Sequence, residues 1–260
     1  MKIAFVTAFY DPTIGGVEKV VQEFAERLVK EGNEVHVYCS DSDKEKRLKE
    51  KEVVISGVRV HRCYYWFKVS KFGYVWPSVL WKLYKEDFDL IHSHVFGHAH
   101  SFFASLICKF KKIPHVHTTH CPWTEEFRPL LAQLFVNLTY PIFGRLTLKW
   151  ADKVIAITPW ELKFLKKYIN KDKITIIPNG ANEILFKKIK PNKFKQKLGI
   201  KGKLVLYFGR LNITKGPDKF VLAAKEILRE RKDISFVMIG PDEGMKDNVK
   251  KLIGNEKRIK

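Results

Sequence analysis

Two glycine-containing segments each follow a short apolar run and precede a helix-like pattern. The first contains Gly15 and Gly16, and the second, residues 209–216, contains Arg210 and Lys215. A turn that enters a helix presents unpaired backbone N–H groups and the positive end of the helix dipole to an anion. Arginine can hold two phosphate oxygens, and lysine adds a point charge. The second segment therefore predicts a diphosphate site, and the first a loop that approaches a phosphate closely.

An ordinary strand-to-helix turn is the competing interpretation of both segments. Glycine is permissive in any turn, and two basic residues in a strongly basic chain need no ligand. Neither segment has the G-x-G-x-x-G spacing of a dinucleotide-binding loop. The pattern alone leaves both interpretations open.

Histidines are concentrated in one stretch of the chain. Imidazoles two residues apart on a strand share a face, so such pairs form a candidate metal site for a hydrolase. No Asp or Glu stands between His94 and His120 to complete the ligand set. The alternative is that His120 acts on a substrate while the other imidazoles are packed or hydrogen-bonded. Seven of the nine histidines belong to this stretch, namely His92, His94, His98, His100, His115, His117 and His120.

The elements that position these residues alternate between short apolar runs and helical periodicity. Val17–Glu31 carries apolar residues at helical spacing, and Gly32 follows as a stop signal. Repeated strand–helix–strand order predicts an α/β fold with a doubly wound parallel sheet. The other helices are expected at Ala99–Phe110, Glu125–Trp150 and Pro159–Tyr168, and the strands at Lys2–Phe9, Glu34–Cys39, Val58–Cys63, Asp89–Ser93, His115–Thr119, Lys153–Thr158 and Ile174–Pro178.

A strongly basic stretch around Pro191 interrupts this pattern, which then restarts. We predict a first domain at 1–182, a linker at 183–202 and part of a second α/β domain at 203–260. The second domain is expected to contain strands at Leu204–Phe208 and Ser235–Ile239. Two strands and two helices cannot cover a doubly wound sheet on both faces, so we expect this domain to be incomplete.

The chain of 260 residues has 48 Lys and Arg against 28 Asp and Glu, a formal net charge of +20. This excess favours anionic partners, and a solvated lysine-rich surface is the alternative. No two of the four cysteines have Cys-x-x-Cys spacing, which indicates reduced thiols in a cytosolic setting. No signal-peptide pattern and no apolar stretch of ~18 residues is found, so we expect a soluble or peripheral protein.

Basic and aromatic residues interleave in residues 59–81, which include Trp66, Lys71, Phe72, Trp76 and Trp81. Such a segment suits an anionic membrane surface, where lysines reach headgroups and tryptophans lie at the interface. Packing of the rings in the core is the competing interpretation. Stacking on bases is a third, but no nucleic-acid motif accompanies it, and we predict no nucleic-acid partner.

Six pieces of the sequence stand in a particular order and spacing: residues 15–18, Asp89–His94, Thr118–His120, Ala151–Thr158, Ile177–Gly180 and Gly209–Gly216. Taken together, they resemble family 4 of the retaining glycosyltransferases, and the resemblance extends over nearly the whole chain. It implies a GT-B fold, in which two Rossmann-like domains face each other and hold a nucleotide-sugar donor between them. A metal-dependent hydrolase and a non-catalytic membrane- or nucleic-acid-binding module remain as alternatives.

The resemblance also implies roles for residues on the donor side. Gly15 and Gly16 would approach the donor. Arg210 and Lys215 would neutralise its diphosphate as it leaves, so no metal or other cofactor is expected. His120 would contact the sugar and support the developing charge. The anomeric configuration would be retained. The implied catalytic residues are His120, Arg210 and Lys215, and the donor-binding residues are Gly15, Gly16, Arg210, Lys215 and Gly240.

On the acceptor side, the resemblance points to Glu18 and His94. The donor is expected to be UDP- or GDP-linked and the acceptor a lipid or glycan, with the protein in the cytoplasm or peripheral at the inner membrane face. The family carries a pair of glutamates late in its second domain, and the chain ends at Lys260 before that motif. About 100 residues of a usual domain are then missing. We therefore expect a fragment, a split gene product or a chain with a complementing C-terminal partner.

Overall fold

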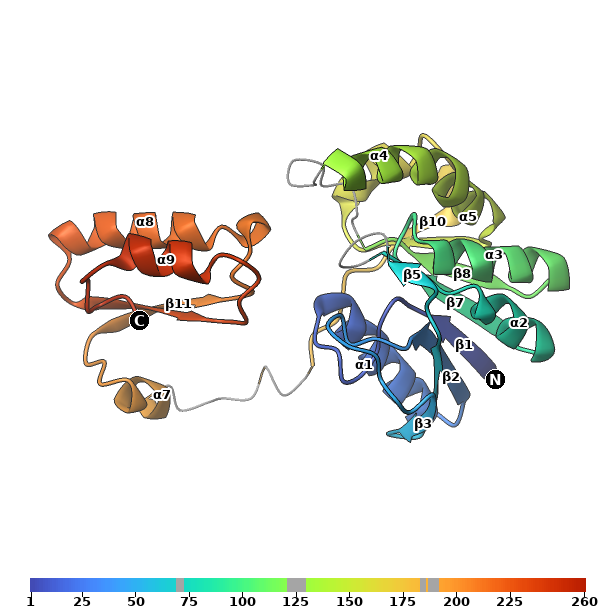
Figure 1. Ribbon diagram of the computed structural model, residues 1–260, viewed down its shortest axis with the longest axis horizontal. Coiled ribbons are helices and arrows are strands. Elements are labelled where there is room, and N and C mark those ends of the chain that lie inside the picture. The colour runs from blue at the N-terminus through green and yellow to red at the C-terminus, as the bar shows by residue number, and fades with distance from the viewer. Residues whose placement is uncertain (69–72, 121–129, 183–185, 187–191) are drawn as a thin grey trace. The chain divides into compact units, whose positions relative to one another are not determined.

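The computed structural model describes residues 1–68, 73–120, 130–182, 186 and 192–260. The chain divides into two compact units, Met1–Ala181 and Asn182–Lys260, each with its own sheet and helices (Figure 1). Part of the predicted linker, including Pro191, lies outside the described residues.

An eight-stranded sheet forms the centre of the first unit. Seven strands run parallel in the order β10-β9-β8-β7-β1-β2-β4, and β3 joins β4 antiparallel at one edge. This is the doubly wound α/β arrangement that the sequence predicts. The strands are β1 (Lys2–Val6), β2 (Glu34–Ser40), β3 (Glu52–Ile55), β4 (Val58–Cys63), β7 (Leu90–His94), β8 (His115–Thr118), β9 (Lys153–Ala156) and β10 (Ile174–Ile176).

Helices cover both faces of this sheet (Figure 1). Alternate residues of β1 belong to two separate cores, because successive side chains of a strand point to opposite faces. Ile3 and Phe5 pack with α1, whereas Ala4 and Val6 pack with α2 and α3. The longer helices are α1 (Gly16–Lys30), α2 (Ser78–Lys85), α3 (Ala99–Lys111), α4 (Leu130–Thr139) and α5 (Arg145–Trp150).

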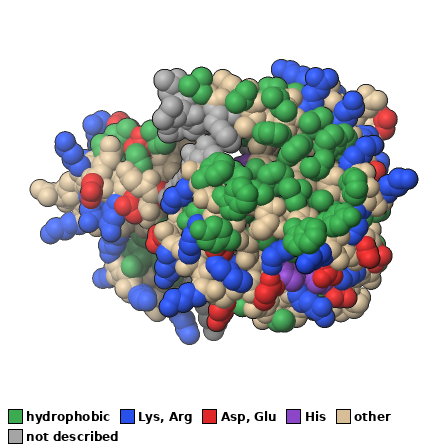
Figure 2. Space-filling view, turned by 45° about the vertical axis from the view of Figure 1, so that its right-hand side comes forward, with side chains coloured by type: hydrophobic (Ala, Val, Ile, Leu, Met, Phe, Trp, Pro, Cys, Tyr) green, Lys and Arg blue, Asp and Glu red, His purple; other side chains and the backbone are tan. Residues whose placement is uncertain are grey.

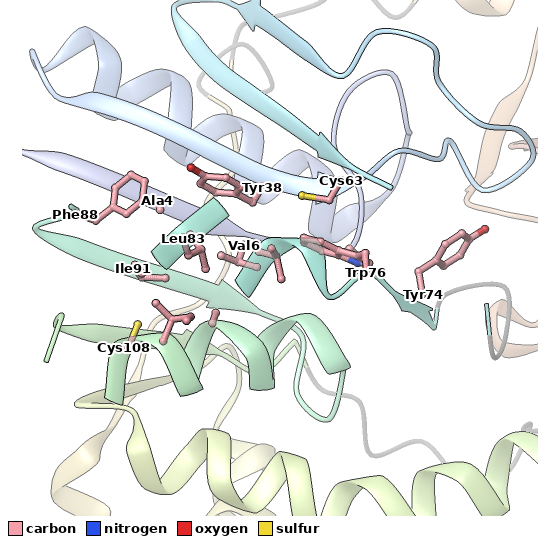
Figure 3. Close-up of a cluster of buried hydrophobic side chains, with 14 of the residues drawn as sticks. Ala4, Val6, Tyr38, Cys63, Tyr74, Trp76, Leu83, Phe88, Ile91 and Cys108 are labelled. Atoms are coloured by element: carbon pink, nitrogen blue, oxygen red, sulfur yellow. The ribbon is translucent and has the colours of Figure 1, made fainter. Parts of the chain in front are cut away.

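The core beneath α2 and α3 contains Trp76, the largest fully buried side chain among the described residues (Figure 3). Trp76, Tyr38 and Leu83 are almost completely buried there. Burying a large apolar side chain contributes roughly 1.5–3 kcal/mol, so this core fixes α2 and α3 against the sheet. Cys39, Cys63 and Cys108 are free and buried, and Cys121 lies outside the described residues.

Several predicted elements differ from the observed ones. The first strand ends at Val6, three residues earlier than predicted. The described part of the predicted helix Glu125–Trp150 consists of α4, a π-helical turn η1 (Tyr140–Gly144) and α5. Pro141 has no N–H to donate, which explains the local departure from the α-helical pattern. The predicted helix Pro159–Tyr168 is reduced to a 3-10 turn, η2 (Pro159–Glu161), and the single turn α6 (Leu162–Leu165).

The sequence analysis missed α2, β3 and a small hairpin formed by β5 (Phe67–Lys68) and β6 (Tyr74–Val75). The hairpin and the start of α2 divide the aromatic segment 59–81. Tyr74 and Trp76 are buried, as the packing interpretation predicts, whereas Trp66 and Trp81 are exposed. Lys71 and Phe72, which belong to the same predicted membrane-contact segment, lie outside the described residues.

The second unit contains the parallel strands β11 (Lys203–Phe208) and β12 (Ile234–Ile239). A third segment, residues 258–260, bonds to the free edge of β12 through an isolated parallel bridge at Ile259. The helices α8 (Pro217–Glu230) and α9 (Lys246–Ile253) pack with Phe236 and Ile259 in one core. A short helix, α7 (Asn192–Lys197), precedes β11.

Among the described residues, no helix combines the length and the apolar character needed to cross a bilayer.

Candidate functional site

The carboxyl ends of β1, β7 and β8 meet at one edge of the first sheet, because adjacent parallel strands share their direction. The loop after β1 leads to Gly15 and Gly16, β7 ends at His94, and His120 follows β8. Four predicted site residues are thereby brought to one edge. This edge is where ligands bind in open α/β sheets.

Gly15 and Gly16 begin α1. Gly15 is extended (φ −177°), and a Cβ there would lie 2.0 Å from Glu18 Oε2. The Glu18 carboxylate is thus folded back over Gly15, where its Oε1 accepts an ion-pair contact from Lys44 Nζ at 2.9 Å. At Gly16 an added Cβ would meet nothing within 4 Å. The open side of the loop is therefore at Gly16, and the predicted acceptor contact Glu18 already has a cationic partner.

His94 and His120 form a hydrogen-bonded pair, with His94 Nδ1 and His120 Nε2 2.9 Å apart. His94 also stacks on His92, with ring centroids 4.2 Å apart. Burial lowers the pKa of His120 to about 4 and the pKa of His94 well below its usual range. Both rings are therefore neutral near pH 7. In that state, His120 can exchange hydrogen bonds with a sugar hydroxyl without carrying charge itself.

Four other histidines of the cluster, His92, His100, His115 and His117, are hydrogen-bonded inside the fold, and the His98 ring contacts that of His100. His92 bonds to Thr118 Oγ1, and His115 and His117 both bond to Ser93 Oγ, each at 2.8 Å. Among the described residues, no three His, Cys, Asp or Glu side chains form a group that could hold a metal ion. In the described part of the chain these imidazoles bond to hydroxyls and to one another, an arrangement that does not favour the hydrolase alternative.

Glu161 is a buried side chain at this edge that the sequence analysis did not single out. Its Oε1 accepts hydrogen bonds from the backbone N–H groups of Ile157 and Thr158, at 2.7 and 3.1 Å. Its Oε2 accepts from the hydroxyl of Thr119, the residue before His120. Thr158 and Glu161 form a capping box, and the S/T-x-x-E spacing is a signal that would have identified it.

Replacing Glu161 with glutamine is expected to lower the free energy of unfolding of the first unit by about 1–2 kcal/mol. The reason is that charge-assisted hydrogen bonds become neutral ones while the shape is kept. Urea unfolding followed by circular dichroism measures the change. Glu45→Gln, an exposed side chain of the first unit, is the control and should have no effect. An unchanged midpoint for Glu161→Gln would mean that the carboxylate does not hold the Thr119 turn.

In the second unit, Arg210 lies at the carboxyl end of β11, and its Nη1 donates to both carboxylate oxygens of Glu243 at 3.1 Å. Glu243 also accepts from Asn212 Nδ2 at 3.1 Å. The sequence analysis did not foresee this pair. It holds the loop after β11 against the loop after β12, and it fixes the direction in which the guanidinium points.

Lys215 ends a 3-10 turn, η5 (Ile213–Lys215), immediately before α8. Gly216 follows in the left-handed region (φ 62°), which favours glycine, and Pro217 begins the helix. The Lys215 side chain is exposed, and within the described part of the chain its Nζ has no ion pair or hydrogen bond. An unneutralised cation beside a helix N-terminus is suited to an anion.

Gly240 directly follows β12, and its hydrogen atoms face the neighbouring loop. A Cβ there would lie 1.8 Å from the carbonyl oxygen of Gly209. Gly209 N–H and Leu211 N–H also donate to Ile239 O and Pro241 O, each at 2.9 Å. Close backbone packing is thus a sufficient reason for glycine at this position, and the predicted contact with the donor stays a prediction.

Two family models match the chain. Glycosyltransferase Family 4 matches residues 14–183, and Glycosyl transferases group 1 matches residues 188–258. The chain belongs to Glycosyltransferase Family 4. This confirms the predicted family and the enzyme class, a glycosyltransferase. It favours neither the hydrolase nor a non-catalytic module.

Two curated relatives of this family 4 member extend the comparison. An uncharacterized glycosyltransferase of Methanocaldococcus jannaschii is 29% identical, over 98% of this chain and 67% of that protein. The alpha-monoglucosyldiacylglycerol synthase of Streptococcus pneumoniae is 23% identical, over 95% of this chain and 57% of its own length. The chain therefore spans only about two thirds or less of these relatives.

Solved structures support the fold of the family 4 chain. The Anabaena protein HepE in complex with UDP matches with a TM-score of 0.74 and 18% identity, over 100% of this chain and 68% of that one. At this identity the likeness concerns the fold alone. Together with the mixed α/β architecture and largely parallel sheet, it confirms the predicted GT-B fold class.

Proposed function

We propose that the chain supplies the acceptor-side domain and the phosphate-binding part of the donor site of a retaining glycosyltransferase. The donor is a sugar linked to UDP or GDP. The observation that carries the proposal is Lys215, an exposed cation without a partner among the described residues, placed immediately before α8. Lys215 would contact the donor diphosphate as a point charge and stabilise it as the leaving group.

Arg210 would bind the same diphosphate. Of its guanidinium nitrogens, Nη1 contacts Glu243, while Nε and Nη2 make no hydrogen bond within the described residues. Two free N–H positions allow bidentate contact with two phosphate oxygens. Glu243 would then act as the group that holds Arg210 in position before the donor arrives.

In the first unit, His120 would accept or donate a hydrogen bond to the transferred sugar. Its neutral ring, backed by His94, suits a hydroxyl of the sugar better than a phosphate. Gly16 leaves open space where a donor group can approach the N-terminus of α1. The charge that a metal would otherwise supply comes from Arg210 and Lys215, so the reaction needs no divalent cation.

The acceptor is a lipid or a glycan. Support comes from the Streptococcus pneumoniae relative, whose name describes glucosyl transfer to form a glycosyldiacylglycerol. A lipid acceptor would suit a cytoplasmic protein that is peripheral at the inner membrane face, as predicted from the sequence.

A complementing C-terminal fragment is proposed as a partner of the second unit. Leu206 and Phe208 point to the face of β11 opposite the α8–α9 core, because β-strand side chains alternate and Tyr207 contacts Phe220 of α8. Phe208 is 81% exposed. A doubly wound sheet covers both faces with helices, so an additional helical segment would bury this side.

Isothermal titration of the full chain with UDP, GDP and uridine tests the donor site. We expect one of the two diphosphates to bind, with uridine at least about tenfold weaker because it lacks the charged group. Addition of EDTA should leave the affinity unchanged. Absence of binding by both diphosphates, or an absolute need for a divalent metal, would contradict the proposed site.

A further inference from the structure

One face of the first unit is built from helices without acidic residues. The chain has 28 Asp and Glu, yet none occurs in α2, α3, α4, η1 or α5. Their charged residues are basic: Lys82, Lys85, Lys109, Lys111, Arg145 and Lys149. By contrast, α1 on the other side of the sheet carries Glu and Lys in alternation, as a solvated helix does. The charged residues of these helices are therefore all cationic, but two of them have carboxylate partners from adjoining segments, Lys111 with Asp87 and Lys82 with Glu52.

Large apolar side chains project from the same helices into solvent. Figure 2 shows hydrophobic side chains gathered on one face of this unit, with Lys and Arg, and also Asp and Glu, around them. Trp81 and Tyr84 of α2 and Phe110 of α3 form a row, with ring centroids about 6 Å apart at each step. We call the following set the helix face: Trp81, Tyr84, Leu106, Phe110, Leu134, Leu138, Ile142 and Phe143, each exposed by 37–72%.

The helix face is continuous across three elements. Phe102 of α3 contacts Phe143 of η1, with ring centroids 4.7 Å apart, and Trp150 of α5, at 6.0 Å. Exposed apolar area of this extent marks an interaction surface on soluble domains. It is separate from the donor-binding loops, because these side chains lie on the helices and not at the carboxyl edge of the sheet.

Lysines lie directly beside the exposed rings. Lys85 Nζ is 4.7 Å from the Trp81 ring centroid, and Lys111 Nζ is 5.7 Å from that of Tyr84. An aromatic ring with an adjacent cation matches the boundary of an anionic bilayer, where rings enter the headgroup region and cations contact phosphates. Lys85 and Lys109 are exposed and have no carboxylate partner among the described residues, so their charges are available to lipid phosphates.

We propose that the helix face docks on an anionic lipid bilayer. The proposal goes beyond sugar transfer, since docking needs neither donor nor acceptor chemistry. It also differs from the membrane contact predicted for residues 59–81, because the principal surface is formed by α2, α3 and the region from α4 to α5. Docking would hold the first unit at the surface where a lipid acceptor resides.

Sedimentation with vesicles tests the proposal on the full chain. Vesicles of equal parts phosphatidylcholine and phosphatidylglycerol should bind the protein, whereas pure phosphatidylcholine should not. Trp81→Gln with Phe110→Gln should weaken binding at least about tenfold. Lys85→Gln with Lys109→Gln should weaken it about 25-fold, roughly fivefold per lysine, and added salt should mimic this loss.

Matched variants elsewhere separate docking from general effects. Val54→Gln with Leu222→Gln removes exposed apolar side chains, and Lys30→Gln with Lys225→Gln removes exposed charges, both outside the helix face. These variants should bind vesicles like the wild type. UDP titration should give the same result for all variants, so failure of docking and failure of the donor site are distinguishable.

Three results would overturn the proposal. The first is equal binding to both kinds of vesicle, and the second is helix-face variants that bind like the controls. The third is a stable dimer in sedimentation velocity that the Trp81→Gln and Phe110→Gln changes dissociate, with no vesicle binding by the wild type. That last result would assign the face to a second copy of the chain.

Discussion

Acidification from pH 7 to about 5 is expected to unfold the first unit while the second stays folded. All nine histidines belong to the first unit, and none lies in residues 182–260. Burial lowers the pKa of His92 and His100 to about 3 and of His115 and His120 to about 4. The pKa values of His94 and His117 are also well below the usual range because of burial.

The direction of the effect follows from proton binding. Above about pH 6.5, these imidazoles are neutral in the folded and unfolded states and contribute nothing to pH dependence. Below that pH, the unfolded chain binds protons that the folded chain does not, so stability falls as pH falls. Each of the four histidines with a pKa of about 3 or 4 costs about 2 kcal/mol at pH 5, which makes about 8 kcal/mol for the four, and His94 and His117 act in the same direction. This is comparable to the whole stability of a typical domain.

Circular dichroism and tryptophan fluorescence during pH titration measure the transition. The second unit has no tryptophan and no histidine, so fluorescence reports the first unit alone. His100→Gln is the sharpest variant, because His100 Nε2 donates to His94 O at 2.9 Å and an amide can replace that donor. The slope of the unfolding free energy against pH should then correspond to about one proton fewer taken up on unfolding than in the wild type. Stability that does not change between pH 7 and 5 would contradict the buried neutral cluster.

Lys215→Ala is expected to lower the affinity for UDP or GDP by about 10–100-fold while leaving uridine binding unchanged. The loss corresponds to a hydrogen bond to a charged group, worth about 1.5–3 kcal/mol. No structural cost accompanies it, because Lys215 is exposed and makes no contact within the described residues that its removal would break. Isothermal titration of the variant with both ligands measures the difference.

The matched control is Lys225→Ala, which removes an exposed lysine from α8 of the same unit. It should bind both ligands as the wild type does. Equal losses for diphosphate and nucleoside in Lys215→Ala would mean that the residue supports the fold of the site and does not contact phosphate. Raised salt should reduce the wild-type affinity toward that of the variant, since an exposed charge is screened.

The order of the strands and the position of the site loops were predictable from the sequence. Short apolar runs that alternate with helical periodicity identify β1, β2, β4, β7, β8 and β9 with errors only at their ends. The prediction works because strand and helix periods are local properties of the chain. The motif at residues 209–216 was also visible, because a basic turn between a strand and a helix needs no knowledge of distant residues.

Tertiary structure alone decided which side chains meet. His94 of β7 is paired with Thr118 of β8, and Thr118 stands two residues before His120 in the chain. This strand register brings the imidazoles of His94 and His120 together. Glu161 reaches Thr119 from 42 positions away, and Glu243 reaches Arg210 from 33. Hydrogen-bond partners at such separations depend on strand pairing and burial. A local pattern therefore gives the residue types of a site, and the sheet decides whether each is neutral, held by a partner or free to bind.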